Sequence, residues 1–347
     1  MSLNKNCIPL DKFINQALYD PKNGFYMNTN PFGYKGDFIT SPNISILFSE
    51  MLSIWVISFW QNLNYPKDVN LIELGAGNGQ MIYDMINSFK NFPKFYKHCK
   101  FIILEKSPYL KKIQKKKLKK FNVKWIKNIN EIQKGNNIFI ANEFFDALPI
   151  KQFFKIENKW IERYVKLDKN NKKSFINIDL DIKKIEKKIG YKISNNQKII
   201  EYSPLALEYL KNISKKINNK KGALLIIDYG YTENSMKDTL MAIKKHKISK
   251  LLEEFGNFDI TYKLNFNLLK KLTNIFNLKC QGITTQREFL INLGIQQRAE
   301  IISRNLPFSK KANIYYRLKR LLDKDQMGDL FKVMLLTNEK INFKIGF

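Results

Sequence analysis

The stretch that decides the fold reads LIELGAGNG and covers residues 71–79. An apolar run leads into three glycines that alternate with other residues, Gly75, Gly77 and Gly79, and a helix-like segment follows at 80–89. Glycines let the chain turn sharply and let a ligand lie directly against the backbone. A dinucleotide-binding turn prefers the different spacing G-x-G-x-x-G. The stretch predicts a strand, a tight turn that contacts a ligand, and a helix; a glycine turn without a ligand is the alternative.

Short apolar runs alternate with helix-like segments along the rest of the chain. Continuous apolar runs are typical of strands that are buried on both faces. The runs cover residues 69–74, 101–104, 123–126, 138–141, 223–227 and 331–336. Helices are expected after Ser41, Ser107 and Ser203, because each serine precedes a proline and its hydroxyl can cap the first turn. Strands that alternate with helices predict an α/β fold with a doubly wound sheet.

Two stretches interrupt this alternation. Within residues 151–200, two strand-like runs flank a polar turn at 157–159, so an inserted antiparallel β element is expected there. Residues 232–262 follow neither pattern, and we expect them to form a second, irregular insertion.

Acidic and amide side chains follow the strand-like runs, at the sheet edge where ligands of open α/β sheets bind. Glu105 ends the second run, where an acid can accept both hydroxyl protons of a ribose; a surface salt bridge is the alternative. Asn142, Glu143 and Asp146 follow the fourth run, and two carboxylates among aromatic residues suit a cationic acceptor. The alternative there is that Asp146 caps a following helix and Glu143 is structural.

The charge of the chain is strongly unbalanced. Its 347 residues include 60 Lys and Arg against 31 Asp and Glu, which gives a net charge of +29. Only six of the basic residues are Arg, and Lys is the weaker residue for bidentate recognition of bases and phosphates. The excess is spread along a chain rich in Ile and Asn, as AT-rich coding would produce. We interpret it as a compositional bias that attracts anions weakly, rather than as a specific nucleic-acid-binding surface.

The remaining composition excludes several classes. Three scattered cysteines and two histidines, His98 and His246, argue against a disulfide framework and a zinc site, so we expect a reducing compartment and no metal. The longest apolar stretch, 46–60, contains Glu50 and is too short to span a bilayer. The first residues match neither a signal peptide nor an Arg-rich presequence, so a cytoplasmic protein is expected.

The glycine spacing, with an acid two residues before the first glycine, resembles the S-adenosyl-L-methionine (SAM) loop of class I methyltransferases. Segments along nearly the whole chain are similar to the MidA-like methyltransferases, a family that includes the mitochondrial complex I assembly methyltransferase. They cover residues 18–21, 24–27, 36–42, 73–79, 141–149, 227–231, 238–240, 285–290 and 327–333. The segments 142–149 and 327–333 are the most specific. Ala76, Asn78 and Ser49 depart from residues that are usual in the family.

The resemblance implies SAM as the cofactor and a seven-stranded, mostly parallel sheet with helices on both faces. The residues expected to bind SAM are Glu73, Gly75, Gly77, Gly79 and Glu105, with Gly36, Asp37 and Thr40 in a lid. We expect residues 1–66 to form a helical lead that carries this lid. Residues 67–347 would form the methyltransferase core with both insertions.

The resemblance also implies an activity, symmetric dimethylation of an arginine during complex I assembly. The substrate would be the NADH–quinone oxidoreductase core subunit that corresponds to the mitochondrial 49-kDa protein. A bacterial enzyme would work in the cytoplasm and a eukaryotic one in the mitochondrial matrix. Glu143 would bind the guanidinium, with Asp146 as its partner and Asn142 beside them. The alternatives are a nucleic-acid or small-molecule methyltransferase and an assembly factor that binds SAM without turnover.

Overall fold

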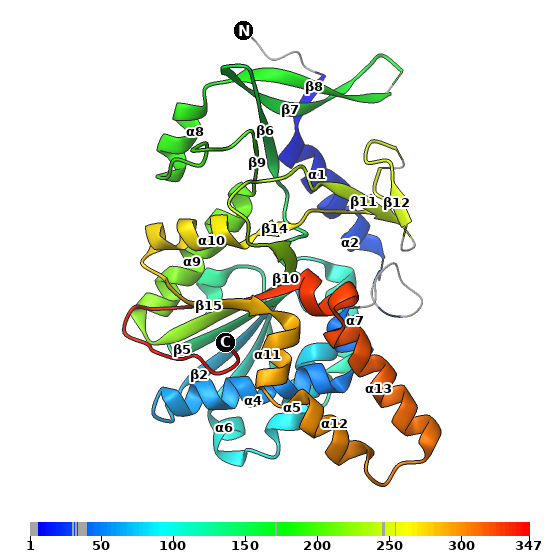
Figure 1. Cartoon of the computed structure of the whole chain (residues 1–347), viewed down its shortest axis with the longest axis vertical. Helices are drawn as coiled ribbons and strands as arrows, with labels where there is room; N and C mark the ends of the chain where they lie inside the picture. Colours follow the sequence, from blue (N-terminus) through cyan, green and yellow to red (C-terminus); the bar gives the residue numbers. More distant parts are fainter. Residues whose placement is uncertain are drawn as a thin grey trace. The chain divides into compact units, whose positions relative to one another are not determined.

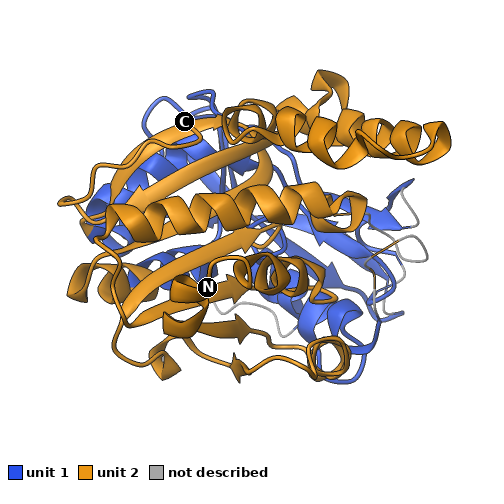
Figure 2. Ribbon diagram, turned by 90° about the horizontal axis from the view of Figure 1, so that it is seen from below, with its two compact units in different colours: residues 1–29, 145–211, 231–276 blue, residues 30–144, 212–230, 277–347 orange. Residues whose placement is uncertain are grey.

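The computed structural model describes residues 6–29, 31, 33, 40–170, 172–244, 247–253 and 255–347. The chain forms two compact units, each assembled from separate stretches (Figure 2). Unit 1 comprises residues 1–29, 145–211 and 231–276, and unit 2 comprises residues 30–144, 212–230 and 277–347. The division after residue 66 into a helical lead and a core stays a prediction.

Unit 2 contributes seven strands to an eight-stranded sheet, whose eighth strand, β14 (Leu264–Asn265), pairs with β10 (Figure 1). The seven strands are β2 (Val69–Leu74), β3 (Cys99–Leu104), β4 (Val123–Ile126), β5 (Asn136–Asn142), β10 (Gly222–Tyr231), β15 (Lys279–Thr285) and β16 (Phe331–Thr337). They pair in the order β15-β16-β10-β5-β2-β3-β4. The strands from β10 to β4 run parallel, whereas β16 is antiparallel to both of its neighbours. The predicted mostly parallel sheet is confirmed, and six strands coincide with the six apolar runs.

The seventh strand, β15, has no counterpart among those runs. Its sequence, KCQGITT, is mostly polar, and all of its residues are partly or fully exposed. It lies at the end of the strand order, where it pairs with β16. A strand at a sheet edge is covered less than a central one, so it lacks the apolar pattern from which the other six were predicted.

Helices bury the central strands. All six residues of β2 are buried, and Leu71 and Leu225 share one apolar core with α4 (Ile46–Asn62) and α5 (Gln80–Phe89). Residues 47, 51, 55 and 59 of α4 are buried, as their spacing requires. The other helical segments are α3 (Ser41–Ile44), α6 (Pro93–His98), α7 (Pro108–Lys117), η1 (Ile129–Glu131), α11 (Gln286–Asn292), α12 (Ile295–Ser303), α13 (Phe308–Leu322) and η3 (Lys324–Gly328).

Two of the three predicted helix caps are confirmed. The hydroxyls of Ser107 and Ser203 each accept a backbone hydrogen bond in the first turn of α7 and of α9 (Pro204–Asn219). The prediction that Ser41 caps a helix is wrong, because Ser41 is itself the first residue of α3. Its hydroxyl donates instead to Gln286 Oε1 at 3.2 Å, a buried partner far along the chain.

Unit 1 contains two antiparallel sheets. In the first, β7 pairs with β1, β6 and β8, and β6 also pairs with β9. This confirms the antiparallel element predicted within residues 151–200. The second sheet pairs β11 with β12 and β13. The expectation that residues 232–262 form an irregular insertion is therefore wrong where these three strands lie. Strands of three or four residues are too short to show a periodic pattern.

The elements of unit 1 are bounded as follows. The strands are β1 (Cys7–Pro9), β6 (Lys151–Ile156), β7 (Lys159–Leu167), β8 (Lys173–Leu180), β9 (Ile199–Tyr202), β11 (Met241–Lys244), β12 (Lys247–Ser249), β13 (Asp259–Thr261) and β14 (Leu264–Asn265). The helical segments are α1 (Leu10–Tyr19), α2 (Phe25–Asn28), α8 (Ile182–Ile189), α10 (Phe266–Thr273) and η2 (Asn274–Phe276).

Candidate active site

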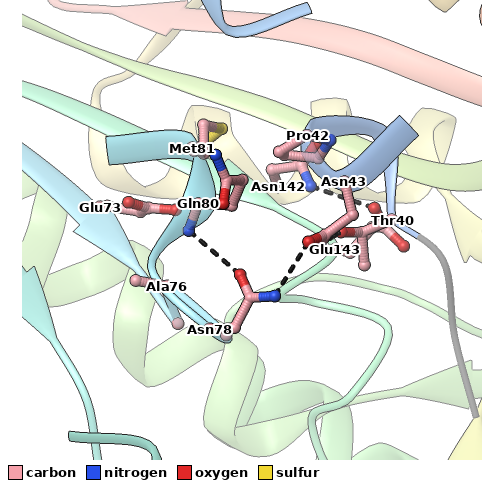
Figure 3. A pocket seen from close by; sticks show the side chains of 12 residues that line it. Thr40, Pro42, Asn43, Glu73, Ala76, Asn78, Gln80, Met81, Asn142 and Glu143 are labelled. Atoms are coloured by element: carbon pink, nitrogen blue, oxygen red, sulfur yellow. Dashed lines mark hydrogen bonds between the residues drawn. The ribbon is translucent and has the colours of Figure 1, made fainter. Parts of the chain in front are cut away.

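A hollow of about 340 Å³, including its part open to solvent, lies within unit 2 at the carboxyl ends of β2 and β5 (Figure 3). Its walls come from α3, the end of β2, the glycine loop, the first turn of α5 and the end of β5. The lining residues are Thr40, Pro42, Asn43, Glu73, Gly75, Ala76, Gly77, Asn78, Gln80, Met81, Asn142 and Glu143.

The glycine loop joins β2 to α5 in a conformation that few other residues adopt. Gly75, Gly77 and Gly79 have φ values of 67°, 50° and 76°, all in the left-handed region. At Gly75, a Cβ atom would lie 2.8 Å from Cδ2 of Phe144. Gly75 and Gly77 line the hollow, whereas Gly79 does not and instead precedes α5.

Amide side chains connect this loop to α3 (Figure 3). Asn78 Nδ2 donates to Asn43 Oδ1 at 2.9 Å, and Asn78 Oδ1 accepts the backbone N–H of Gln80 at 3.1 Å. Asn43 Nδ2 donates to Thr40 Oγ1 at 2.7 Å. Of these residues only Thr40 was predicted at the site. Asn43, Gln80 and Met81 were missed, because neutral side chains carry neither a charge nor a characteristic spacing.

Glu73 lines the hollow and is almost fully buried, with 5% of its surface exposed. The backbone N–H of Ile82 donates to its carboxylate. Its Oε2 atom is buried and has no hydrogen-bond partner among the described residues. Burial raises the pKa of Glu73 to about 8. The group is therefore mostly protonated at neutral pH, and a cation placed beside it would favour its charged form.

Asn142 and Glu143 enter the hollow from the end of β5 (Figure 3). Glu143 has a φ of 51°, a left-handed conformation that is uncommon for glutamate. Its Oε1 atom accepts Asn142 Nδ2 at 3.1 Å and the backbone N–H of Ser41 at 3.4 Å. Asn142 Oδ1 is buried without a hydrogen-bond partner in the described part of the chain. A strained backbone such as that of Glu143 persists only where surrounding contacts hold it, and such backbones are common at functional sites.

Glu105 follows β3, as predicted, but it does not line this hollow. Its carboxylate accepts the backbone N–H of Ser107 at 2.9 Å and Nε2 of Gln114 at 2.8 Å. Burial raises its pKa despite these bonds. Gln114 Nε2 also donates to the carbonyl oxygen of Gly77 at 2.8 Å. Gln114, which was not predicted, therefore connects Glu105 to the glycine loop.

The remaining predicted residues lie elsewhere. The structure assigns Asp146 to unit 1, where its carboxylate accepts the hydroxyl of Thr261 at 3.1 Å. The alternative role of Asp146 as a helix cap is wrong, because β6 is the next regular element. A partnership of Asp146 with Glu143 stays a prediction. Gly36 and Asp37 lie outside the described residues.

The hollow offers acceptors rather than cations to a ligand. Asn142 Oδ1, and Glu73 Oε2 once its carboxyl group is charged, are buried acceptors that lack a donor in the described chain, and buried acceptors are nearly always satisfied. A ligand that carries an ammonium group and hydroxyl groups would supply such donors, whereas a phosphate would not. Within the described ranges, no three His, Cys, Asp or Glu side chains gather as metal ligands.

Comparison with known proteins leads to the same chemistry. Residues 51–284 match the model of a family described as "S-adenosyl-L-methionine-dependent methyltransferase". The "Protein arginine methyltransferase NDUFAF7, mitochondrial" of Xenopus laevis is 30% identical over 364 residues, which cover 94% of this chain and 80% of that protein. The human protein of that name is 28% identical over 357 residues, which cover 95% of this chain and 80% of that protein.

Two crystal structures of Burkholderia thailandensis proteins have the same fold. One, bound to S-adenosyl-homocysteine, has a TM-score of 0.83 at 20% identity, covering 99% of this chain and 90% of that one. A native structure has a TM-score of 0.82 at 22% identity, covering 98% and 90%. The likeness confirms the predicted class I methyltransferase fold. With the family match over residues 51–284, it places the chain in the family of S-adenosyl-L-methionine-dependent methyltransferases.

Proposed function

We propose that the protein transfers methyl groups from SAM to an arginine side chain of a protein substrate. The proposed substrate is the complex I core subunit that corresponds to the mitochondrial 49-kDa protein, methylated during assembly of the complex. The names of the Xenopus and human relatives support arginine as the acceptor. Those names also call the relatives mitochondrial; we place a eukaryotic enzyme in the mitochondrial matrix and a bacterial one in the cytoplasm.

The residues that would hold SAM are those of the hollow, together with Glu105. Glu73 Oε2 and Asn142 Oδ1 are the acceptors available to its ammonium group, and Gly75 and Gly77 let it lie against the backbone. Glu105 follows β3 and is connected to the loop through Gln114, so it is the acceptor that we assign to the ribose hydroxyls. When bound, SAM supplies an activated methyl group whose leaving group is a neutral thioether.

Glu143 is the residue that we assign to the acceptor. A guanidinium is protonated at ordinary pH, and its lone pairs are delocalised. The Glu143 carboxylate can bind this cation, keep its charge on the nitrogens that face the carboxylate, and leave one terminal nitrogen aimed at the methyl group. Holding the two reactants in line supplies much of the rate. Proton loss can follow the transfer, so the site needs no strong base.

One observation carries this assignment. Glu143 keeps a left-handed backbone at the end of β5, and its carboxylate lines the same hollow as Glu73 and the glycine loop. The strained conformation would be relieved by glycine or asparagine, yet glutamate occupies it. We infer that the carboxylate is needed at this position. Symmetric dimethylation would then require the singly methylated side chain to bind again with its other terminal nitrogen towards the methyl donor.

Replacing Glu143 tests the assignment. We expect Glu143→Gln to keep SAM affinity within about twofold and to lower the single-turnover rate of methyl transfer by about a hundredfold or more, because the amide cannot hold the guanidinium charge. Glu208→Gln, the same change at an exposed position of α9, is the control and should change neither value. Loss of SAM affinity with a normal single-turnover rate would refute the role of Glu143.

The substrate requires a separate experiment. The protein is incubated with methyl-labelled SAM and the complex I core subunit from its own source, and the labelled amino acid is identified after hydrolysis. Symmetric dimethylarginine is the expected product. Label on another amino acid, or on nucleic acid added in parallel, would contradict the proposal. Binding of SAM without any transfer would favour the non-catalytic assembly factor.

A further inference from the structure

The hairpin of α12 and α13 exposes large apolar side chains at its tip. Ile301 is 61% exposed, Leu306 36% and Phe308 86%. Figure 1 shows the hairpin extending away from the sheet of unit 2, with the turn between the two helices at its far end. A nearly fully exposed phenylalanine with apolar neighbours is uncommon on a soluble surface and marks a contact site.

The outer face of α13 continues this apolar surface. Ala312, Tyr315 and Tyr316 lie four, seven and eight residues after Phe308, so all four share one face of the helix. Tyr315 is 40% exposed and Tyr316 is 66% exposed. The opposite face is already used, because Leu318 and its neighbours are buried in the core of unit 2. Packing of α13 within the unit therefore does not explain its outer aromatic residues.

The same hairpin is strongly basic. Residues 295–322 contain seven Lys and Arg and one Glu, and they include four of the six arginines of the chain. Arg298 pairs with Glu50 at 2.8 Å and Arg317 donates to the Ile44 carbonyl at 3.1 Å, so both fasten the hairpin to the unit. Within residues 301–311 the charged residues are Arg304, Lys310 and Lys311, all of them basic. They flank the exposed apolar tip.

We propose that the tip of the hairpin and the outer face of α13 bind the surface of an anionic lipid bilayer. Leu306 and Phe308 would enter the boundary of the acyl chains, and Tyr315 and Tyr316 would lie at the level of the headgroups. Arg304, Lys310 and Lys311 would pair with lipid phosphates. In the described part of the chain no helix is long and apolar enough to span a bilayer, so the contact would be peripheral.

The shape and chemistry of the tip favour lipid over the other polyanions. Leu306 lies in the turn between the two helices and Phe308 begins α13 directly after it, so both belong to the projecting end of the hairpin (Figure 1). A fluid bilayer can accommodate a projecting wedge without a complementary cavity. Nucleic acid could stack on the rings of Phe308 and Tyr316, but the aliphatic side chains of Ile301 and Leu306 beside them would gain nothing from stacking, whereas a bilayer would bury both kinds. The proposal is independent of methyl transfer, because none of these residues lines the hollow of the active site.

Vesicle sedimentation tests the proposal with the full chain. We expect the protein to bind phosphatidylcholine vesicles that contain phosphatidylglycerol, to bind pure phosphatidylcholine poorly, and to dissociate as salt rises. Phe308→Ala should weaken binding about fivefold or more. Reversing two charges in Lys310→Glu/Lys311→Glu should weaken it about tenfold or more.

Matched controls test whether the loss of vesicle binding is specific to this surface or follows from removing any exposed apolar side chain or positive charge. Ile248→Ala removes an apolar side chain that is 83% exposed in unit 1. Lys119→Glu/Lys120→Glu makes the same change in net charge at exposed positions after α7. Neither control should lower vesicle binding by more than about twofold. Every variant should keep the affinity of the wild-type protein for S-adenosyl-homocysteine, which shows that the fold is intact.

A spectroscopic measurement locates the contact. In Phe308→Trp, brominated lipids should quench the new tryptophan, whereas the wild-type protein should show little quenching. Absence of quenching, or equal loss of binding in the charge control, would overturn the proposal. Failure to bind vesicles combined with hairpin-dependent binding of single-stranded RNA would also overturn it. So would a dimer that Phe308→Ala dissociates, because a second copy would then cover this face.

Discussion

Glu73 is an acid whose charge depends on what occupies the hollow beside it. In the ligand-free protein its pKa is about 8, because burial disfavours the carboxylate. A ligand ammonium binds the charged form, so below that pH binding must release a proton. We expect SAM affinity to rise with pH, by up to about tenfold per unit, until about pH 8, and to fall at higher pH, where the α-amino group of SAM loses its own proton. Calorimetry in two buffers of different ionisation enthalpy measures the released proton.

A matched variant separates this effect from other titrations. Glu73→Gln should bind SAM more weakly and release no proton through this group. The folded pKa of Glu73 lies above its ordinary value of 4.5, so stability from this group is lost as pH rises from about 4.5 to about 8. The ligand-free Gln variant should therefore melt higher than the wild-type protein near pH 8. Affinity that is constant across this range would contradict the role of Glu73.

The glycine loop is the element on which the hollow depends. We expect Gly75→Ala to weaken S-adenosyl-homocysteine binding by about tenfold or more, because its Cβ would lie 2.8 Å from Phe144 and force that ring to move. A left-handed φ adds a stability cost of about 1–2 kcal/mol for a residue with a Cβ atom. Gly294→Ala is the control: its φ is 85°, but the nearest atom is 3.6 Å away. It should lower the melting temperature and leave affinity unchanged, and equal affinity loss in both variants would contradict the expectation.

Strands and helices could be predicted where burial imposes an apolar pattern on the sequence. Strand β2 and its parallel neighbour β5 are buried on both faces, so their sequences are mostly apolar and do not alternate with polar residues. Strand β15 is half exposed, and its position beside β16 is fixed by pairing that the sequence does not reveal. At Ser41 the serine–proline pattern was present, but the hydroxyl found a buried partner in Gln286. Long-range packing decided both cases.

At the scale of the whole molecule, the net charge of +29 makes a distinct prediction. If the lysine excess is a compositional bias, it attracts polyanions weakly and without specificity. We expect filter binding of single-stranded RNA at low salt to be largely lost near physiological ionic strength, as counterion release requires. Sequence-selective RNA binding that persists at that salt would instead revive the nucleic-acid methyltransferase.

The arrangement of the whole site was only partly predictable. The acids and glycines stand out in the sequence through their charge and spacing, and Glu73, Gly75, Asn142 and Glu143 do line one hollow. The amides that connect its walls, such as Asn43, carry no such signal. Nor does any local pattern indicate that unit 1 combines three separate stretches of chain. Contacts between residues far apart in sequence determine that assembly.

The position of β16 has a consequence for how the protein is made. It follows every other strand of its sheet in the sequence, yet it pairs on one side with β10 and on the other with β15. The ribosome must therefore synthesise the chain as far as residue 337 before all strands of the sheet can pair. Until then the nascent chain keeps two unpaired strand edges, which are templates for aggregation. Translation that stalls before this strand would leave a chain that depends on chaperones.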